Sequence, residues 1–267
     1  MNDRQFYERF WSGYQTGLQA QISIHSESRR PLHKLLQKLL PAEIPAHVLE
    51  VGCGTALDSC LLAAERPLVR AVASDYSQEA VRVAARNAGE LALPVTVLAA
   101  DLAALPFAAG AFDLVFSQGV LEHFADPLPA IAEQARVLRT GGALVVDVPQ
   151  KFNLYTLRKR RAMRENRWPW GWETEYSAAE LRARGGAAGL IPFAAIGHQH
   201  GRIVDRLLIH PHRTLHNKLT RLRRPGAGPN GYRPGSLARA WESLWDWLDT
   251  HLGAYTAINV AVAFRKP

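Results

Sequence analysis

Short apolar runs alternate with amphipathic segments between residues 48 and 148 of the chain. The apolar runs have the length of buried strands and lie at 48–51, 69–74, 95–99, 112–117 and 143–148. The segments between them repeat apolar residues every three or four positions, which predicts helices. Strands that are separated by helices join in parallel, so the pattern predicts a doubly wound α/β sheet that binds its ligand at the carboxyl ends of the strands.

Local signals mark the ends of several predicted helices. Ser77 and the pair Asp126-Pro127 are typical of helix starts, and the pair Gly141-Gly142 is typical of a helix stop. A short helix over 178–189 is expected next, followed by strands near 190–197 and 256–264.

Two amphipathic helices precede the first strand. Large apolar residues recur every four positions along the first of them, at Phe6, Phe10, Tyr14 and Leu18, and Trp11 joins the same face. The second spans 31–40 and is expected to point Leu32, Leu35, Leu36 and Leu39 inward. We expect the second helix to cover the sheet, and an aromatic stripe like that of the first is most often also part of a core.

The turn after the first strand is a candidate binding site. Gly52 and Gly54 follow Glu50 at the strand end and lead into a helical pattern. Glycine lacks a Cβ atom, so the backbone can turn sharply and approach a ligand, and the free N–H groups of the next helix attract an anionic group. The turn therefore predicts a small cofactor.

Asp75 ends the second strand and indicates which class of cofactor the turn binds. A carboxylate in this place can accept two hydrogen bonds from the 2′,3′-diol of a ribose, which favours a nucleoside. A dinucleotide is disfavoured because Leu57 stands where its fingerprint has a third glycine, and no lysine of a phosphate-binding loop follows.

Further motifs carry a family resemblance. They are the segments Ala100–Phe107 and Phe112–Phe124 and the sequence Arg-Val-Leu-Arg-x-Gly-Gly over 136–142. With the glycine turn and Asp75 they resemble the class I S-adenosylmethionine-dependent methyltransferases, in particular the branch of the ubiquinone and menaquinone biosynthesis enzymes. The resemblance is strongest over 45–150.

The resemblance implies a Rossmann-like seven-stranded sheet in which the last two strands form an antiparallel pair. Residues 1–40 would be N-terminal helices, the first of them a lid over the cofactor. Residues 41–267 would be the methyltransferase domain, with helical cap insertions at about 149–177 and 198–254. The chain departs from many relatives at Ala56, where they have a third glycine; if that site needs a positive φ, alanine costs about 1 kcal/mol.

The resemblance also implies that the cofactor is S-adenosylmethionine and that its product is S-adenosylhomocysteine. It further implies which residues contact the methionine end of the cofactor. Gly52 and Gly54 would pass under the methionine, and Glu50 would orient that end. Ser117 and Gln118 would line the path to the sulfonium.

At the nucleoside end, Asp75 would bind the ribose hydroxyls and Tyr76 would lie against the adenine. Asp101 would accept a hydrogen bond from the adenine amino group, with the Leu102 N–H nearby.

His123 is the candidate catalytic base, because imidazole titrates near neutral pH and Leu121-Glu122-His123 follows the cofactor strand. Two alternatives stay open: His123 holds its loop by hydrogen bonds, or the acceptor needs no strong base.

Charge is concentrated in two segments. The chain has 32 Lys and Arg against 24 Asp and Glu, and 151–167 and 202–224 each hold seven basic residues and one acidic residue. A basic segment indicates an acidic substrate, an anionic membrane surface or nucleic acid, or else a solvated face. The aromatic connection Trp168–Tyr176 beside the first segment suits a pocket wall or an interfacial anchor, or simple packing.

Metal and redox sites are not expected. His198, His200, His210, His212 and His216 lie close in sequence but no carboxylate or thiolate pattern accompanies them. Cys53 and Cys60 are expected to be buried thiols. The sequence has neither an apolar run of about 20 residues nor a signal peptide, so we expect a cytoplasmic protein, with peripheral membrane contact left open.

Three functions follow from these patterns. The first is methyl transfer to a small-molecule or lipid-like acceptor, the second is methylation of RNA or protein through the basic cap, and the third is cofactor binding without catalysis. The sequence Ser117-Gln118-Gly119-Val120 differs from the Asn/Asp-Pro-Pro-Tyr signature of amide and adenine methylation, and no RNA-binding module is evident, which disfavours nucleic acid.

Overall fold

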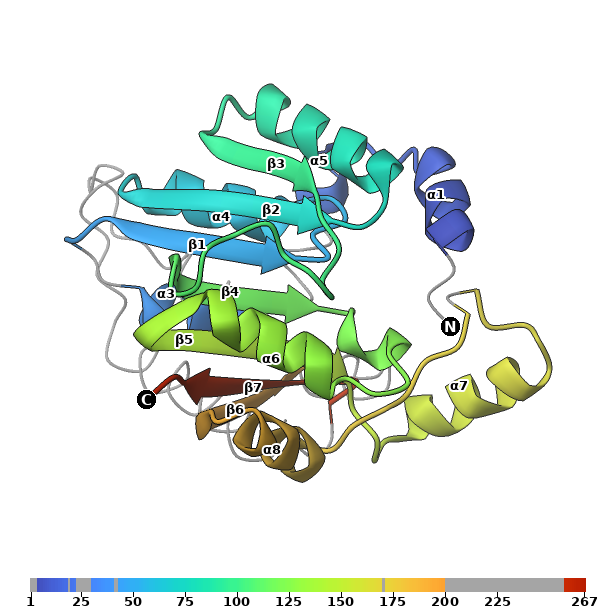
Figure 1. Ribbon diagram of the computed structural model, residues 1–267. Coiled ribbons are helices and arrows are strands. Elements are labelled where there is room, and N and C mark those ends of the chain that lie inside the picture. Colours follow the sequence, from blue (N-terminus) through green and yellow to red (C-terminus); the bar gives the residue numbers. More distant parts are fainter. Residues whose placement is uncertain (1–3, 19, 23–29, 41–42, 170, 200–256) are drawn as a thin grey trace, which may run out of the picture.

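The computed structural model describes residues 4–18, 20–22, 30–40, 43–169, 171–199 and 257–267. Its strands are β1 (Ala46–Val51), β2 (Val69–Asp75), β3 (Val95–Ala99), β4 (Phe112–Gln118), β5 (Leu138–Pro149), β6 (Ile191–His198) and β7 (Asn259–Arg265). They form one seven-stranded sheet in the order β3-β2-β1-β4-β5-β7-β6 (Figure 1). The first five strands run parallel, and β7 runs antiparallel to both β5 and β6, which confirms the predicted sheet.

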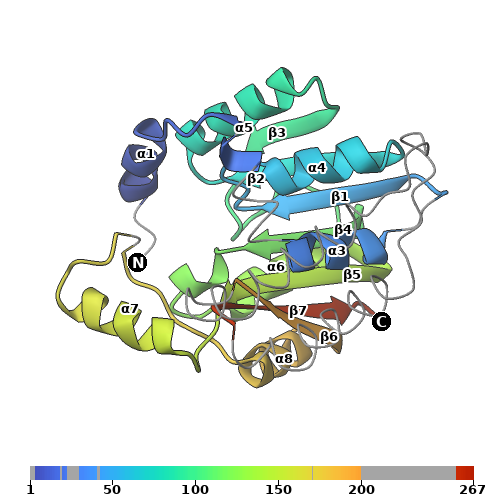
Figure 2. The ribbon, with the colours of Figure 1, turned by 180° about the vertical axis from the view of Figure 1, so that it is seen from behind.

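The helices cover both faces of this sheet (Figures 1 and 2). They are α1 (Arg4–Ser12), α3 (Arg30–Leu39), α4 (Leu57–Glu65), α5 (Gln78–Glu90), α6 (Leu128–Val137), α7 (Leu154–Arg164) and α8 (Ala178–Ala187), with a short 3₁₀ turn η1 (Leu121–His123). Successive strand residues point to opposite faces, so Leu49 and Val48 enter two different core clusters. The periodicity of the sequence thus predicted a buried core on both faces of the sheet.

The N-cap prediction at Ser77 is confirmed, because its hydroxyl accepts a hydrogen bond from the Ala80 N–H at the start of α5. The prediction for α3 is confirmed as well. Leu32 and Leu36 are buried, and Leu35 and Leu39 pack against the same cluster.

The predicted helix stop at Gly141-Gly142 is wrong. Helix α6 ends at Val137, and β5 begins directly at Leu138. The register with β4 jumps between the pairs Phe112–Leu138 and Leu114–Ala143, so both glycines lie in an irregularity inside β5. A Cβ atom on Gly142 would lie 2.7 Å from the Leu138 side chain, which explains the glycine by crowding and not by helix termination.

Helix α1 lies outside the core. It ends at Ser12, so the aromatic stripe does not continue as one helix to Leu18, and none of its residues is fully buried. Its contacts are with α5 (Figure 1). Of the two predicted insertions, the first contains α7, whereas most of the second lies outside the described residues, and with it the basic segment 202–224 and the histidines His200, His210, His212 and His216 of the sequence cluster.

Candidate functional site

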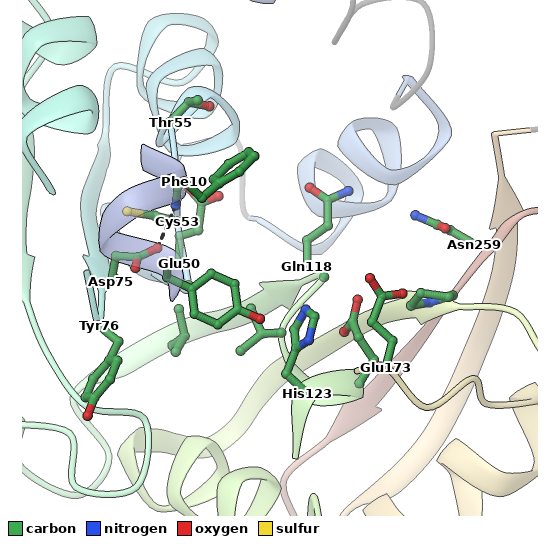
Figure 3. Close-up of a pocket in the computed structure, with 18 of the residues that line it drawn as sticks. Phe10, Glu50, Cys53, Thr55, Asp75, Tyr76, Gln118, His123, Glu173 and Asn259 are labelled. Carbon is green, nitrogen blue, oxygen red and sulfur yellow. Dashed lines mark hydrogen bonds between the residues drawn. The ribbon is translucent and has the colours of Figure 1, made fainter. Parts of the chain in front are cut away.

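A cavity of about 510 Å³ opens at the carboxyl ends of the parallel strands. Residues of the β1–α4 turn, of β2, of the segment after β4 and of α1 line it. Figure 3 shows Asp75 and Tyr76 on one side and His123, Glu173 and Asn259 on the other. The cavity therefore joins the predicted cofactor turn to the predicted catalytic histidine.

The glycine turn needs its glycines at both positions. Gly52 and Gly54 have φ values of +67° and +51°, which favour glycine. A Cβ atom would lie 2.2 Å from the Val120 side chain at Gly52 and 2.7 Å from the Trp11 ring at Gly54. The turn is thus packed on one side by the segment after β4 and on the other by α1.

Ala56 adopts a left-handed conformation with φ 53° and ψ 25° at the start of α4. This is the positive φ that the missing third glycine of the turn led us to consider, and its strain is on the order of 1 kcal/mol for a residue with a Cβ atom. The remaining fold holds the residue in place, because Ala56 is completely buried.

Asp75, the predicted ribose ligand, lines the cavity. Its carboxylate accepts hydrogen bonds of 2.9 Å from the Gly54 N–H and from the Ser77 N–H. Burial raises its pKa, and the N–H groups of Ser77, Gly54 and Tyr76 oppose that rise. A carboxylate has about four acceptor positions, so two hydrogen bonds leave capacity for a ligand in the cavity.

Glu50 is fixed by the helix that follows the turn. One of its oxygens accepts hydrogen bonds from the Ser59 N–H at 3.1 Å and from the Ser59 hydroxyl at 2.6 Å. The carboxylate is buried and lines the cavity, so it brings a negative charge to the methionine side of the predicted site.

Eight of the ten predicted site residues line the cavity: Glu50, Gly52, Gly54, Asp75, Tyr76, Leu102, Gln118 and His123. Asp101 and Ser117 do not line it. Asp101 is exposed, and its carboxylate accepts a hydrogen bond from the Ala103 N–H in its own turn. Ser117 is buried within β4.

His123 faces the cavity in a defined orientation. Its Nδ1 lies 3.1 Å from the carbonyl oxygen of Trp172, and a carbonyl only accepts, so Nδ1 carries the proton and Nε2 keeps a lone pair. Burial lowers the pKa of His123, an effect that the Trp172 carbonyl and Glu173 partly oppose. The imidazole is therefore neutral at neutral pH and able to accept a proton.

Comparison with known proteins agrees with this geometry. Residues 49–146 match the family model of a methyltransferase domain. The malonyl-[acyl-carrier protein] O-methyltransferase of Herminiimonas arsenicoxydans is 30% identical over 221 residues, which cover 78% of this chain and 75% of that protein. The chain belongs to the S-adenosylmethionine-dependent methyltransferases.

Other relatives match smaller parts. The demethylmenaquinone methyltransferase of Thermus thermophilus is 37% identical over 38% of this chain and 46% of that protein, so the chain spans less than half of that relative's length. A solved structure of phosphoethanolamine N-methyltransferase 2 from Haemonchus contortus aligns with 98% of this chain and 60% of that one, at a TM-score of 0.62 and 18% identity. That likeness shows the shared fold.

Sequence reasoning missed a second set of cavity residues in the methyltransferase. They come from α1, η1, α7, the connection to α8, the residue after β6 and the start of β7: Tyr7, Glu122, Tyr155, Lys159, Trp168, Glu173, Gln199 and Asn259. Tyr7 lies against His123, with ring centroids 5.5 Å apart. Two signals pointed to parts of this set without assigning the residues: the first helix, expected as a lid, and the aromatic connection Trp168–Tyr176, named as a candidate pocket wall.

The basic residues of α7 differ in how far they are buried. Lys159 is 2% exposed and lines the cavity, and its Nζ lies 2.7 Å from Glu173 and 3.1 Å from Glu175. Arg160 also pairs with Glu175, at 3.1 Å. The basic segment 151–167 is therefore not a single solvated face, because buried acids hold Lys159 inside.

His198 has an internal partner in the methyltransferase. Its Nε2, on β6, lies 2.8 Å from Asp147 Oδ1, on β5, and both side chains are buried. Within the part of the chain that the structure describes, no three His, Cys, Asp or Glu side chains converge as metal ligands. Cys53 and Cys60 are buried free thiols, as predicted.

None of the described helices is long and apolar enough to cross a bilayer.

Proposed function

We propose that the methyltransferase transfers a methyl group to a small-molecule acceptor bound in the cavity between the glycine turn and His123. The observation that carries this proposal is the continuity of the cavity, which Asp75 and His123 both line. When bound, S-adenosylmethionine supplies a methyl group activated on a positively charged sulfur. Methyl transfer is an in-line displacement, so the protein's task is to align the two reactants.

The residues present fit this cofactor. The glycine turn lines the cavity in a left-handed backbone conformation that brings its main chain to the cavity wall, and Asp75 has acceptor capacity for the ribose. Glu50 offers a negative charge at the opposite end for the methionine ammonium, and Tyr76 and Leu102 line the cavity as apolar contacts for the adenine. We leave Asp101 and Ser117 outside this set, since neither lines the cavity.

We assign to α1 the role of lid. Tyr7, Phe10 and Trp11 line the cavity, and Trp11 packs beside Gly54. The helix contacts the sheet domain without entering its core, which suits an element that opens for cofactor exchange.

Peripheral contact with an anionic membrane is a further part of the proposal, and the surface of α7 supports it. Leu154 and Leu157 are 72% and 60% exposed, and Arg158 and Arg161 are exposed on the same helical face. Apolar side chains beside cations suit a membrane boundary. Co-sedimentation with anionic vesicles should decrease in a Leu154→Ser/Leu157→Ser variant; no binding by the wild type would remove this part.

The experiment that tests the main proposal is calorimetric titration with S-adenosylhomocysteine, followed by screening of metabolites, lipids and RNA with radiolabelled S-adenosylmethionine. Label in a small molecule supports the proposal. Label in RNA or protein would favour the second function, and cofactor binding without any labelled product would favour the third.

A further inference from the structure

Glu122 is a buried acid without a partner for one of its oxygens. The residue is 3% exposed and lines the cavity. Its Oε2 has no hydrogen-bond partner among the described residues. Burying such an oxygen is unfavourable unless a ligand satisfies it.

The acids around Glu122 have partners of their own. Glu173 pairs with Lys159, and Glu175 pairs with Lys159 and Arg160. Asp147 pairs with His198. The positive charge that balances Glu122 is therefore expected to come from a bound molecule.

Aromatic rings line the same part of the cavity. Tyr7 and Tyr155 contribute to its wall, and Tyr7 packs edge-on against His123. Trp168 also lines it, but Lys159 Nζ already lies over that ring, 5.8 Å from its centroid. Faces of aromatic rings attract organic cations, most strongly where water is excluded. An acid with a free oxygen and the rings of Tyr7 and Tyr155 form the binding chemistry of an ammonium ion.

Electrostatics agrees with this geometry. Burial raises the pKa of Glu122 well above its ordinary value; its own backbone N–H opposes that rise, the charges of Glu173 and Asp147 add to it, and Lys159 opposes it. A bound cation would favour the ionised carboxylate again, so binding and ionisation support each other.

We propose that Glu122 and the aromatic wall bind the acceptor as an organic ammonium ion, so that the methyltransferase methylates an amine. This inference rests on the proposed function and names its substrate class. It replaces the acidic acceptor expected from the basic segments, because the cavity is lined by Glu50, Asp75, Glu122 and Glu173 and by the single cation Lys159 among the described residues.

His123 completes the chemistry. It follows Glu122 in η1, and its Nε2 lone pair accepts a proton from the ammonium. The freed nitrogen pair then forms the N–C bond while the C–S bond breaks and its electrons stay on sulfur, giving an N-methylammonium and a neutral thioether. The proton on His123 passes to solvent.

The test is calorimetric titration of the full chain, saturated with S-adenosylhomocysteine, with 2-phenylethylamine and with its neutral counterpart 2-phenylethanol at pH 7.5. We expect the ammonium to bind at least tenfold more tightly than the alcohol. Glu122→Gln keeps size and shape and should bring the ratio near one. The matched control Glu165→Gln changes an exposed acid at the end of α7 and should leave the ratio unchanged.

Equal affinity of the wild type for both probes would overturn the inference and leave the proposed function standing, and this result does not depend on whether the variant folds. Weaker binding of S-adenosylmethionine but not of S-adenosylhomocysteine by Glu122→Gln would assign the carboxylate to the sulfonium and also overturn it. Failure of S-adenosylhomocysteine to bind the wild type would overturn both proposals.

Discussion

Glu8 accepts a hydrogen bond of 2.8 Å from the Ser77 hydroxyl, although the two residues lie 69 positions apart. The same carboxylate accepts from the Gln78 N–H at 2.9 Å and the Glu79 N–H at 3.0 Å. One side chain of α1 thus satisfies the free N–H groups at the start of α5, where the helix dipole also favours a negative charge. This contact joins the proposed lid to the sheet domain.

Glu8→Gln should loosen α1. In the wild type, partial burial raises the pKa of the Glu8 carboxyl. Hydrogen bonds from the Glu79 and Gln78 N–H groups and from the Ser77 hydroxyl, together with the charge of Arg4, outweigh burial and lower the pKa overall. A lowered pKa means that the contact stabilises the fold above the unfolded-state pKa and is lost as pH falls through the folded-state pKa. Hydrogen exchange of residues 4–12 should accelerate several-fold in the variant, and in the wild type on acidification.

The control for this experiment is Arg9→Gln, because Arg9 is exposed on the same helix. If both variants exchange at the wild-type rate, Glu8 does not hold α1.

Asp75→Asn should weaken binding of S-adenosylhomocysteine by about 1–3 kcal/mol, the range for hydrogen bonds to a charged group. Asp101→Asn is the matched control, since Asp101 is exposed and outside the cavity, and its affinity should stay at the wild-type level. Calorimetry measures both. An equal loss in the two variants would return Asp101 to the adenine role that the sequence predicted for it.

His123→Gln should lower kcat by about 100-fold or more, the contribution of a general base, and leave cofactor affinity unchanged. Burial lowers the pKa of His123, so the wild-type rate should fall with acidification only below its ordinary value of 6.5. The pH profile of kcat checks this. If kcat and cofactor affinity decrease together, the histidine serves to hold the Trp172 segment.

Lys159→Met should reduce the free energy of unfolding by about 3–5 kcal/mol, because it leaves two buried carboxylates without their shared cation. The matched change Arg161→Gln removes an exposed pair with Glu165, which solvent screens, and should leave the free energy of unfolding nearly unchanged. Urea titration gives both values. Similar small losses would mean that Glu173 and Glu175 find other partners or take up protons.

The sheet and the cofactor turn were predictable because their signals are local. Alternating apolar runs predict the parallel strands, and the glycine that many relatives have at position 56 pointed to the positive φ found at Ala56. Helix α6 ends earlier than predicted, and the glycine pair lies inside β5, where crowding at Gly142 excludes a Cβ atom; the sequence does not distinguish this use of glycine from a helix stop.

The acceptor side of the cavity was not predictable in this way. Glu122 precedes the histidine chosen as the base, yet nothing near it in sequence shows that Glu173 and Lys159 come to lie beside it. Likewise, Glu8 reads as an ordinary polar residue of an amphipathic helix, and its role appears only when α5 is placed against α1. Contacts between distant segments determine these roles.

The position of β7 between β5 and β6 has a consequence for synthesis on the ribosome. Strand β6 is translated first, but its sheet neighbour β7 begins only at Asn259. Until β7 is synthesised, β6 therefore has no strand to pair with, and the edge of β5 that later pairs with β7 stays open. A nascent chain stalled before Asn259 would carry an incomplete sheet with an unpaired strand, which is the form most exposed to association with other chains and to chaperones.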